Sequence, residues 1–421
     1  MSFETISVIG LGYIGLPTAA MFASRKKKVI GVDVNQHAVD TINQGKIHIV
    51  EPDLDMIVHA AVSEGYLKAT TTPEAADAFL IAVPTPFLPC AEGDIPAPDL
   101  SYIEAASKAI APVLKKGDLV ILESTSPVGA TEQMAAWLAE ARADLTFPQT
   151  HGEEADINIA HCPERVLPGH VVRELVENDR VIGGLTAKCS ARAVELYKTF
   201  VQGECVVTNA RTAEMAKLTE NSSRDVQIAF ANELSIICDK LDINVWELIA
   251  LANRHPRVNI LQPGPGVGGH CIAVDPWFIV SKTPEEAQII HTARKVNDSK
   301  PKWVINKVKL AIADFLQANP DKTAKDVTIA CYGLAFKPDI DDLRESPAMA
   351  ITQKIAEMHA GRVIAVEPNI ESIPTKLKHV ELVEFDIAAK EADVQVLLVD
   401  HKEFKDASVV HGQVIDTKGI W

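Results

Sequence analysis

Short apolar runs and longer amphipathic stretches alternate in the first half of the chain, with Gly and Pro residues near the joins. The short runs are typical of buried strands, and the stretches between them favour helices. We therefore expect strands at residues 5–9, 29–32, 78–83, 119–122 and 157–160. Strands that alternate with helices favour a parallel sheet, so residues 1–205 are expected to form one doubly wound, Rossmann-like domain.

The pattern changes between residues 211 and 241, where apolar residues recur mostly at three- and four-residue steps without a breaker. This spacing predicts one long helix. Further helical patterns follow at residues 245–252, 285–296 and 303–316. The Gly and Pro residues between positions 261 and 275 exclude a helix or strand interior there. We expect residues 206–318 to form a central helical domain that carries this Gly-rich loop.

Beyond residue 319 the alternation of strands and helices resumes, with strands expected at residues 327–332, 363–366 and 394–399. Residues 319–421 are therefore expected to form a second, smaller Rossmann-like domain. The predicted fold is α/β, with two Rossmann-like doubly wound domains joined by a central helical segment that contains one long helix.

The composition is ordinary for a globular protein: 47% of the 421 residues are hydrophobic and 23% are charged, and the length suggests two or three domains. The net charge of −16 argues against nucleic acid and against anionic membranes, because both favour a basic surface. We expect neither a membrane span nor a leader segment. The seven scattered cysteines contain no CxxC pair, which favours reduced thiols in the cytoplasm and no metal site.

The first predicted strand runs directly into the sequence GLGYIG, which a helix, a second strand and Asp33 follow. This order is the dinucleotide-binding fingerprint in its required context. The glycines permit a tight turn and close approach of the pyrophosphate, and the helix N-terminus attracts the phosphates. Asp33 accepts ribose hydroxyls and repels a 2′-phosphate, so NAD is expected rather than NADP. The expected cofactor residues here are Gly10, Gly12, Tyr13, Ile14, Gly15 and Asp33.

Three further motifs follow predicted strand ends: VPTP at 83–86, ESTSPVG at 123–129 and CPERVLPG at 162–169. Ligands of open parallel sheets sit at this edge, so the first two are expected to border the nicotinamide side of the cofactor. The alternative is ordinary strand-end turn chemistry. Glu164 in the third motif has its own alternative, a solvated loop acid.

The Gly-rich loop carries a thiol, Cys271, and an acid four residues later, Asp275. Long loops in globular chains are usually functional or disordered, and the alternative is a linker whose cysteine is a small buried hydrophobe. Lys217 and Asn221 lie one helical turn apart and can both donate to an oxyanion, or they belong to a solvated face. In the last domain, Lys337 and Arg344 suit an anionic ligand, with solvated cations as the alternative.

The motifs GLGYIGLP, VPTP, ESTSPVG, CPERVLPG, EMAKLTEN, GPGVGGHC and GLAFKPDIDDLRESP occur in that order. Together they resemble the nucleotide-sugar dehydrogenase (UDP-glucose/GDP-mannose dehydrogenase) family, which oxidises UDP-hexoses to UDP-uronic acids with NAD. CPERVLPG and GGHCIAVDPW look most like the branch that acts on UDP-N-acetyl-D-mannosamine for bacterial surface polysaccharide of the enterobacterial common antigen type. The glucose branch has a lysine where this chain has Val274, which weakens UDP-glucose as the substrate.

The resemblance implies a four-electron oxidation at C6 with Cys271 as the covalent nucleophile, passing through a thiohemiacetal and a thioester. It implies that Lys217 and Asn221 stabilise the oxyanion, that Asp275 assists proton transfer and that Glu164 serves in thioester hydrolysis. Thr125 would bind water near C6, and Arg257 would reach the substrate of a neighbouring subunit in a homodimer. The expected substrate residues are Glu164, Arg165, Val166, Lys217, Asn221, Arg257, Gly268 and Lys337, and Thr85, Thr125 and Arg344 join the cofactor set.

Three alternatives remain open on the sequence. The same reaction on UDP-N-acetylglucosamine or UDP-glucose predicts the same motifs. A catalytically silent NAD-binding module requires decayed catalytic positions, and here those positions are all present. A one-step dehydrogenase would release one NADH per substrate and would not need Cys271.

Overall fold

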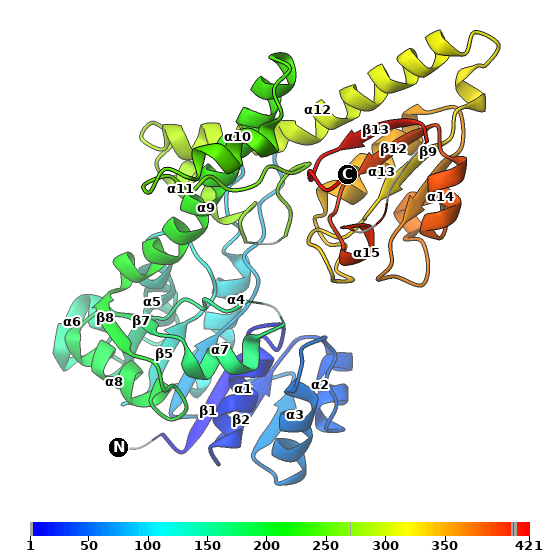
Figure 1. The fold of residues 1–421 in the computed structure, drawn as a ribbon. Helices are drawn as coiled ribbons and strands as arrows, with labels where there is room; N and C mark the ends of the chain where they lie inside the picture. The colour runs from blue at the N-terminus through cyan, green and yellow to red at the C-terminus, as the bar shows by residue number, and fades with distance from the viewer. Residues whose placement is uncertain (1–2, 92, 168, 270, 406, 408–410) are drawn as a thin grey trace. The chain divides into compact units, whose positions relative to one another are not determined.

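The computed structural model describes residues 3–91, 93–167, 169–269, 271–405, 407 and 411–421. The chain divides into two compact units (Figure 1). Unit 1 comprises Met1–Glu220 and Trp277–Thr283, and unit 2 comprises Asn221–Pro276 and Pro284–Trp421. The predicted domain boundaries near residues 205 and 318 stay a prediction.

Unit 1 is built on an eight-stranded sheet in the order β3-β2-β1-β4-β5-β6-β7-β8. The strands are β1 (Thr5–Ile9), β2 (Lys28–Val32), β3 (Leu67–Thr70), β4 (Ala78–Ile81), β5 (Leu119–Leu122), β6 (Asn158–His161), β7 (Arg180–Gly184) and β8 (Cys205–Asn209). All neighbouring pairs are parallel except β6 and β7, where Ala160 pairs with Gly184 and His161 with Gly183. The reversal at β7 places the start of this strand at the carboxyl edge of β6.

Helices pack on both faces of this sheet, which confirms the doubly wound arrangement. Ala78 and Leu80 of β4 belong to one core cluster with α1 and α3, whereas Phe79 and Ile81 belong to another with α4 and α5. Alternate residues of a strand point to opposite faces, so the apolar strands are buried on both sides. The helices of unit 1 are α1 (Gly15–Ser24), α2 (Gln36–Asn43), α3 (Leu54–Ser63), α4 (Ser101–Ile110), α5 (Ala130–Ala141), α6 (Pro148–His151), α7 (Val171–Glu177) and α8 (Ala187–Tyr197).

Unit 2 contains a five-stranded parallel sheet in the order β11-β10-β9-β12-β13. The strands are β9 (Ile329–Tyr332), β10 (Val363–Val366), β11 (Val380–Leu382), β12 (Val394–Leu397) and β13 (Gln413–Asp416). The accompanying helices are α13 (Pro347–Met358), α14 (Phe385–Glu391) and α15 (Lys402–Lys405). Again two core clusters lie on its faces, so the predicted second Rossmann-like fold is confirmed.

The helical segments are α9 (Ala210–Lys240), α10 (Val245–Ala252), α11 (Asp275–Lys282) and α12 (Gln288–Ala318). The predicted long helix is α9, and the units divide within it, between Glu220 and Asn221. The predicted break between residues 296 and 303 is wrong, because α12 runs through Pro301 without interruption. A proline costs one backbone hydrogen bond, and buried residues on both sides of it, among them Lys300 and Val304, hold the helix together.

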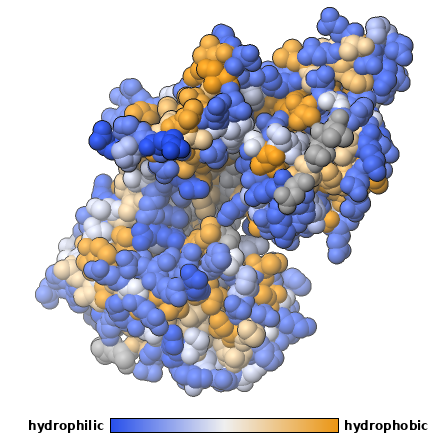
Figure 2. Space-filling view, in the orientation of Figure 1, coloured by the Kyte–Doolittle hydropathy of each residue, from blue (hydrophilic) through white to orange (hydrophobic). Residues whose placement is uncertain are grey.

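No helix among the described residues is both long and apolar enough to cross a membrane. Figure 2 shows hydrophilic residues interspersed with smaller apolar groups on the visible surface.

Candidate active site

The turn after β1 has the backbone geometry that a dinucleotide requires. Gly10 has φ +90° and donates its N–H to Val32 O at 2.8 Å. A Cβ at Gly10 would lie 2.5 Å from Ala82 O, and one at Gly15 would lie 1.7 Å from Gly10 O, so both positions exclude any side chain. A Cβ at the exposed Gly12 would meet nothing within 4 Å. This open position beside the start of α1 fits a pyrophosphate.

Asp33 is held in place at the end of β2. Its Oδ2 accepts the Leu11 N–H at 2.9 Å, and its Oδ1 accepts the Asn35 N–H at 2.8 Å. The side chain is half-buried, and each carboxylate oxygen can accept a further hydrogen bond. Asp33 therefore fits a ribose diol, with Tyr13 exposed at the same turn.

The turns after β4 and β5 are hydrogen-bonded to each other. Thr85 Oγ1 donates to Thr125 O at 2.7 Å, and Ser124 Oγ donates to Val83 O at 2.7 Å. Glu214 of α9 accepts the Gly129 N–H at 2.7 Å and so ties the second turn to the long helix. The two predicted cofactor motifs are thus brought together at the carboxyl edge of the sheet.

Glu164 is buried after β6, so the alternative of a solvated loop acid is wrong. Its Oε1 accepts the Arg165 N–H at 2.7 Å, and its Oε2 lies 2.7 Å from Arg180 Nη1. Arg165 pairs with Glu220 of α9 at 2.6 Å. Val166 packs against the unit 1 core, and Lys217 is half-buried on α9.

In unit 2, Asn221, Cys271 and Asp275 form one hydrogen-bonded group. Asn221 Nδ2 donates to Asp275 Oδ2 at 2.5 Å, and Asp275 is only 3% exposed. The Cys271 carbonyl accepts the N–H of Asp275 at 2.9 Å, so one backbone turn joins the thiol to the acid at the start of α11. Cys271 is an exposed thiol, and the alternative of a buried hydrophobe is wrong.

A buried polar chain anchors the Gly-rich loop. The Gly264 N–H donates to Asn232 Oδ1 at 2.9 Å, and Asn232 Nδ2 donates to Asn297 Oδ1 at 2.9 Å. Asn297 in turn donates to Asp225 Oδ1 at 2.8 Å, and Asp225 is paired with Arg294 at 2.6 Å. Sequence reasoning missed these residues because polar side chains on a helix are normally assigned to its solvent-exposed face. No local signal in the sequence marks them as buried.

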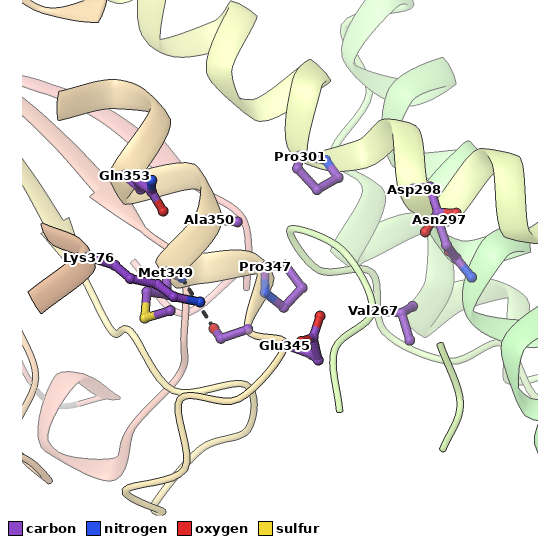
Figure 3. A pocket seen from close by; sticks show the side chains of 11 residues that line it. Val267, Asn297, Asp298, Pro301, Glu345, Pro347, Met349, Ala350, Gln353 and Lys376 are labelled. Carbon is purple, nitrogen blue, oxygen red and sulfur yellow. Dashed lines mark hydrogen bonds between the residues drawn. The ribbon is translucent and has the colours of Figure 1, made fainter. Parts of the chain in front are cut away.

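The loop also packs against the turn that precedes α13. A Cβ at Gly268 would lie 2.6 Å from Glu345 O, so this predicted substrate residue has a packing role here. A pocket of about 280 Å³ lies at this junction (Figure 3). It is lined by Val267, Asn297, Asp298, Pro301, Glu345, Ser346, Pro347, Met349, Ala350, Gln353 and Lys376.

The predicted cations of unit 2 lie outside the lining of this pocket. Arg344 is exposed and pairs with Asp342 at 2.6 Å, and Lys337 is exposed. Arg257 is exposed after α10, and its N–H donates to His255 Nδ1 at 3.3 Å.

One set of potential metal ligands occurs among the described residues: Asp339, His401 and Glu403. The Asp339 N–H donates to His401 Nδ1 at 2.9 Å, and His401 Nε2 lies 2.9 Å from Glu367 Oε2. Both ring nitrogens are therefore used in hydrogen bonds, which fits a structural role for His401.

Comparison with known proteins identifies the family of this chain. Residues 4–201 match the NAD binding domain model of the UDP-glucose/GDP-mannose dehydrogenase family, residues 211–299 match its central domain and residues 330–421 match its UDP binding domain. The chain belongs to this family. The resemblance seen in the sequence is confirmed, and the GLGYIG turn lies in the part that matches the NAD binding domain.

Relatives of this dehydrogenase include enzymes of two named activities. A UDP-N-acetyl-D-mannosamine dehydrogenase of Yersinia pestis is 70% identical over 425 residues, with all of both chains covered. An NDP-N-acetyl-D-galactosaminuronic acid dehydrogenase of Ralstonia nicotianae is 65% identical, covering 100% of this chain and 97% of the relative. The solved UDP-N-acetyl-mannosamine dehydrogenase of Staphylococcus aureus is 43% identical, with a TM-score of 0.83 over 99% of this chain and 95% of its own.

Proposed function

We propose that this enzyme oxidises C6 of UDP-N-acetyl-D-mannosamine to the carboxylate of UDP-N-acetyl-D-mannosaminuronate with NAD. The observation that carries the chemistry is the group formed by Asn221, Cys271 and Asp275: an exposed thiol joined by one turn to a buried acid that an amide holds. The 70% identical relative supports the sugar, as does Val274 in place of the glucose-branch lysine. Asp33 supports NAD over NADP.

Bound NAD supplies a hydride acceptor for each of two oxidations at C6. The Cys271 sulfur adds to the intermediate aldehyde, so an S–C bond forms and the oxygen takes a proton, giving a thiohemiacetal. Lys217 and Asn221 donate hydrogen bonds to the developing oxyanion, and Asp275 exchanges protons with the reacting oxygen and water. After the second oxidation, Glu164 takes a proton from water as it attacks the thioester. The C–S bond breaks, and Cys271 leaves as the thiolate. Thr125 holds a water near C6.

A related N-acetylhexosamine is the second candidate substrate, because the relative from Ralstonia nicotianae is named for an N-acetylgalactosaminuronic acid. The test is the amount of NADH formed per mole of UDP-sugar at completion, with UDP-N-acetylmannosamine, UDP-N-acetylgalactosamine, UDP-N-acetylglucosamine and UDP-glucose. Two NADH from the first sugar alone would support the proposal. Two NADH from another sugar would identify that sugar as the substrate instead. One NADH per sugar would contradict the thioester route.

Cys271→Ser tests the covalent step. A serine oxygen at this site is a poorer nucleophile and leaving group, so overall turnover should fall at least about 1000-fold, or about 4 kcal/mol in the barrier. Cys90→Ser is the matched control, since Cys90 is also an exposed cysteine. Full turnover by the Cys271 variant would end the covalent mechanism.

We also propose a homodimer in which Arg257 reaches the partner's substrate. Phe230 and Ile237 lie on one stripe of α9 and are 51% and 45% exposed. Leu241, directly after α9, is 61% exposed, and Leu251 of α10 is 60% exposed. Figure 2 shows apolar surface over this helical segment. Mixing Cys271→Ser with Arg257→Ala subunits should restore about one quarter of wild-type activity, because each hybrid dimer has one intact site. No restoration in a dimer that exchanges subunits would exclude the shared site.

We propose a cytoplasmic location, because none of the seven cysteines, all of which the structure describes, forms a disulfide. The product would serve bacterial surface polysaccharide of the enterobacterial common antigen type.

A further inference from the structure

A buried ionic cluster lies behind Glu164 in unit 1. Glu123 directly follows β5, Glu164 follows β6, and Arg180 begins β7. The antiparallel register of β6 and β7 continues to the level at which Arg180 faces Glu164, which explains their 2.7 Å ion pair. Tyr197 of α8 donates its hydroxyl to Glu123 Oε1 at 2.6 Å. All four side chains are less than 9% exposed.

The cluster is not fully hydrogen-bonded. Among the residues that the structure describes, Glu123 Oε2 and Arg180 Nη2 are buried without a hydrogen-bond partner. Buried polar atoms are normally satisfied, so each exception calls for an explanation. One guanidinium here serves two carboxylates, because the Arg180 charge acts on Glu123 as well as on Glu164.

We propose that Glu123, acting with Arg180, is a positioning residue that sets how the Glu164 carboxylate is held and how readily it takes a proton from water. This inference rests on the proposed role of Glu164 in thioester hydrolysis. When Glu123 is protonated, Glu164 is the one negative charge beside Arg180, and the full attraction of Arg180 makes Glu164 a weaker base. When Glu123 is ionised, Arg180 is shared and Glu164 accepts the water proton more readily.

The titration of Glu123 supports this arrangement. Burial raises the pKa of Glu123 to about 7, with the Arg180 charge lowering it, the Glu164 charge raising it and the Tyr197 hydrogen bond lowering it. Burial raises the pKa of Cys162 to about 12 and the pKa of Tyr197 well above its ordinary value, so the thiol and the phenol of the cluster stay protonated. The charged groups that face Glu123 are therefore Arg180 from β7 and Glu164 from the turn after β6.

Tyr197→Phe and Glu123→Gln test the proposal through the pH profile of thioester hydrolysis. The measurement follows decay of the Cys271 acyl adduct by intact mass after acid quench, together with NADH formation, between pH 5.5 and 9. Wild-type hydrolysis should rise through an inflection near pH 7. A glutamine at position 123 cannot ionise, so Glu123→Gln should abolish the inflection. Hydrolysis at pH 8 should be at least about 10-fold slower, because Glu164 is then the one carboxylate that faces the Arg180 charge.

Tyr197→Phe removes the hydrogen bond that lowers the pKa of Glu123, so its inflection should move to higher pH. A merely structural role would change rates without moving the inflection. Tyr332→Phe is the matched control, because Tyr332 is a buried phenol in unit 2 that donates to Gln395, and its inflection should stay near pH 7. An unmoved inflection in Tyr197→Phe overturns the proposal, even if Glu123→Gln fails to fold. Absence of NADH from wild type on every UDP-sugar would instead overturn the proposed function.

Discussion

The two sheets use the same turn after their central strands, and they use it differently. Gly10 and Gly333 have φ of +90° and +89°, and their N–H groups donate to Val32 O and Val366 O, each at 2.8 Å. The following leucine N–H donates to an acid at the end of the second strand in both sheets. This acid is Asp33 in unit 1 and Glu367 in unit 2, with the bond to Glu367 Oε2 2.7 Å long.

The two acids differ in how deeply the carboxylate is buried and in which groups donate hydrogen bonds to it. Asp33 accepts two backbone N–H groups and remains half-buried, so its oxygens are open to a ribose. Glu367 is 4% exposed and is surrounded by backbone N–H groups, Asn369 and His401. Burial raises the pKa of Glu367, but the hydrogen bonds from His401 and from the backbone outweigh this and lower it overall. The same backbone turn thus presents its acid to a ligand in unit 1, whereas in unit 2 the acid stabilises the fold through internal hydrogen bonds.

Gly10→Ala and Gly333→Ala should give the largest effects. Each variant combines a strained positive φ with a clash, at 2.5 Å with Ala82 O or 2.4 Å with Val399 Cβ, and should lose about 2–5 kcal/mol of unfolding free energy. Only Gly10→Ala should also weaken NAD binding, by about 100-fold or about 2.7 kcal/mol. Denaturant unfolding and NAD titration measure the two effects. Equal loss of NAD affinity in both variants would contradict the division of roles.

Glu367→Gln should come next, with a loss of about 2–4 kcal/mol in unfolding free energy at pH 7, because a buried carboxylate that accepts several hydrogen bonds is replaced by an amide. The folded pKa of Glu367 lies below its unfolded value of about 4.3. Its contribution is therefore complete above that value and is lost as pH falls through the lowered folded pKa. The stability difference from wild type should shrink in acid, measured by denaturant unfolding from pH 7 to pH 3. A pH-independent difference would show that the charge plays no part.

Asp33→Asn should give the smallest effect on stability, below about 1 kcal/mol, since the side chain is half-exposed. Removing its charge relieves the repulsion of a 2′-phosphate, so the ratio of kcat/KM for NADP over NAD should rise about 10-fold. Glu367→Gln is the control here and should leave this ratio unchanged. A changed ratio in the control would mean that the second turn also contacts a dinucleotide.

Local patterns were enough to predict β1, β2, β4, β5, β6, β9, β10 and β12, the GLGYIG turn and α9, because each depends on neighbours in sequence. They missed β3, β7, β8, β11 and β13. Local breakers also predicted the Gly-rich loop that carries Cys271, but they did not predict the exposure of its thiol. The partners of Glu164 did not, because Arg180 begins a strand that the sequence did not reveal and whose direction only the folded sheet determines. Asn232 was missed for a similar reason: only its tertiary neighbours show that this helical amide is buried.

The reversed strand β7 also bears on how such a sheet gains new functions. Only two residue pairs join β7 to β6, and β7 and β8 lie at one end of the sheet. These two strands can therefore be attached with little change to the strands that carry the dinucleotide turn. In an all-parallel sheet the first residue of a strand lies at the edge remote from the ligand. Reversal brings that first residue, Arg180, to the reactive edge. Lengthening or shortening the segment at residues 171–179 would therefore shift the Arg180 charge relative to Glu164 without altering any residue of the dinucleotide turn.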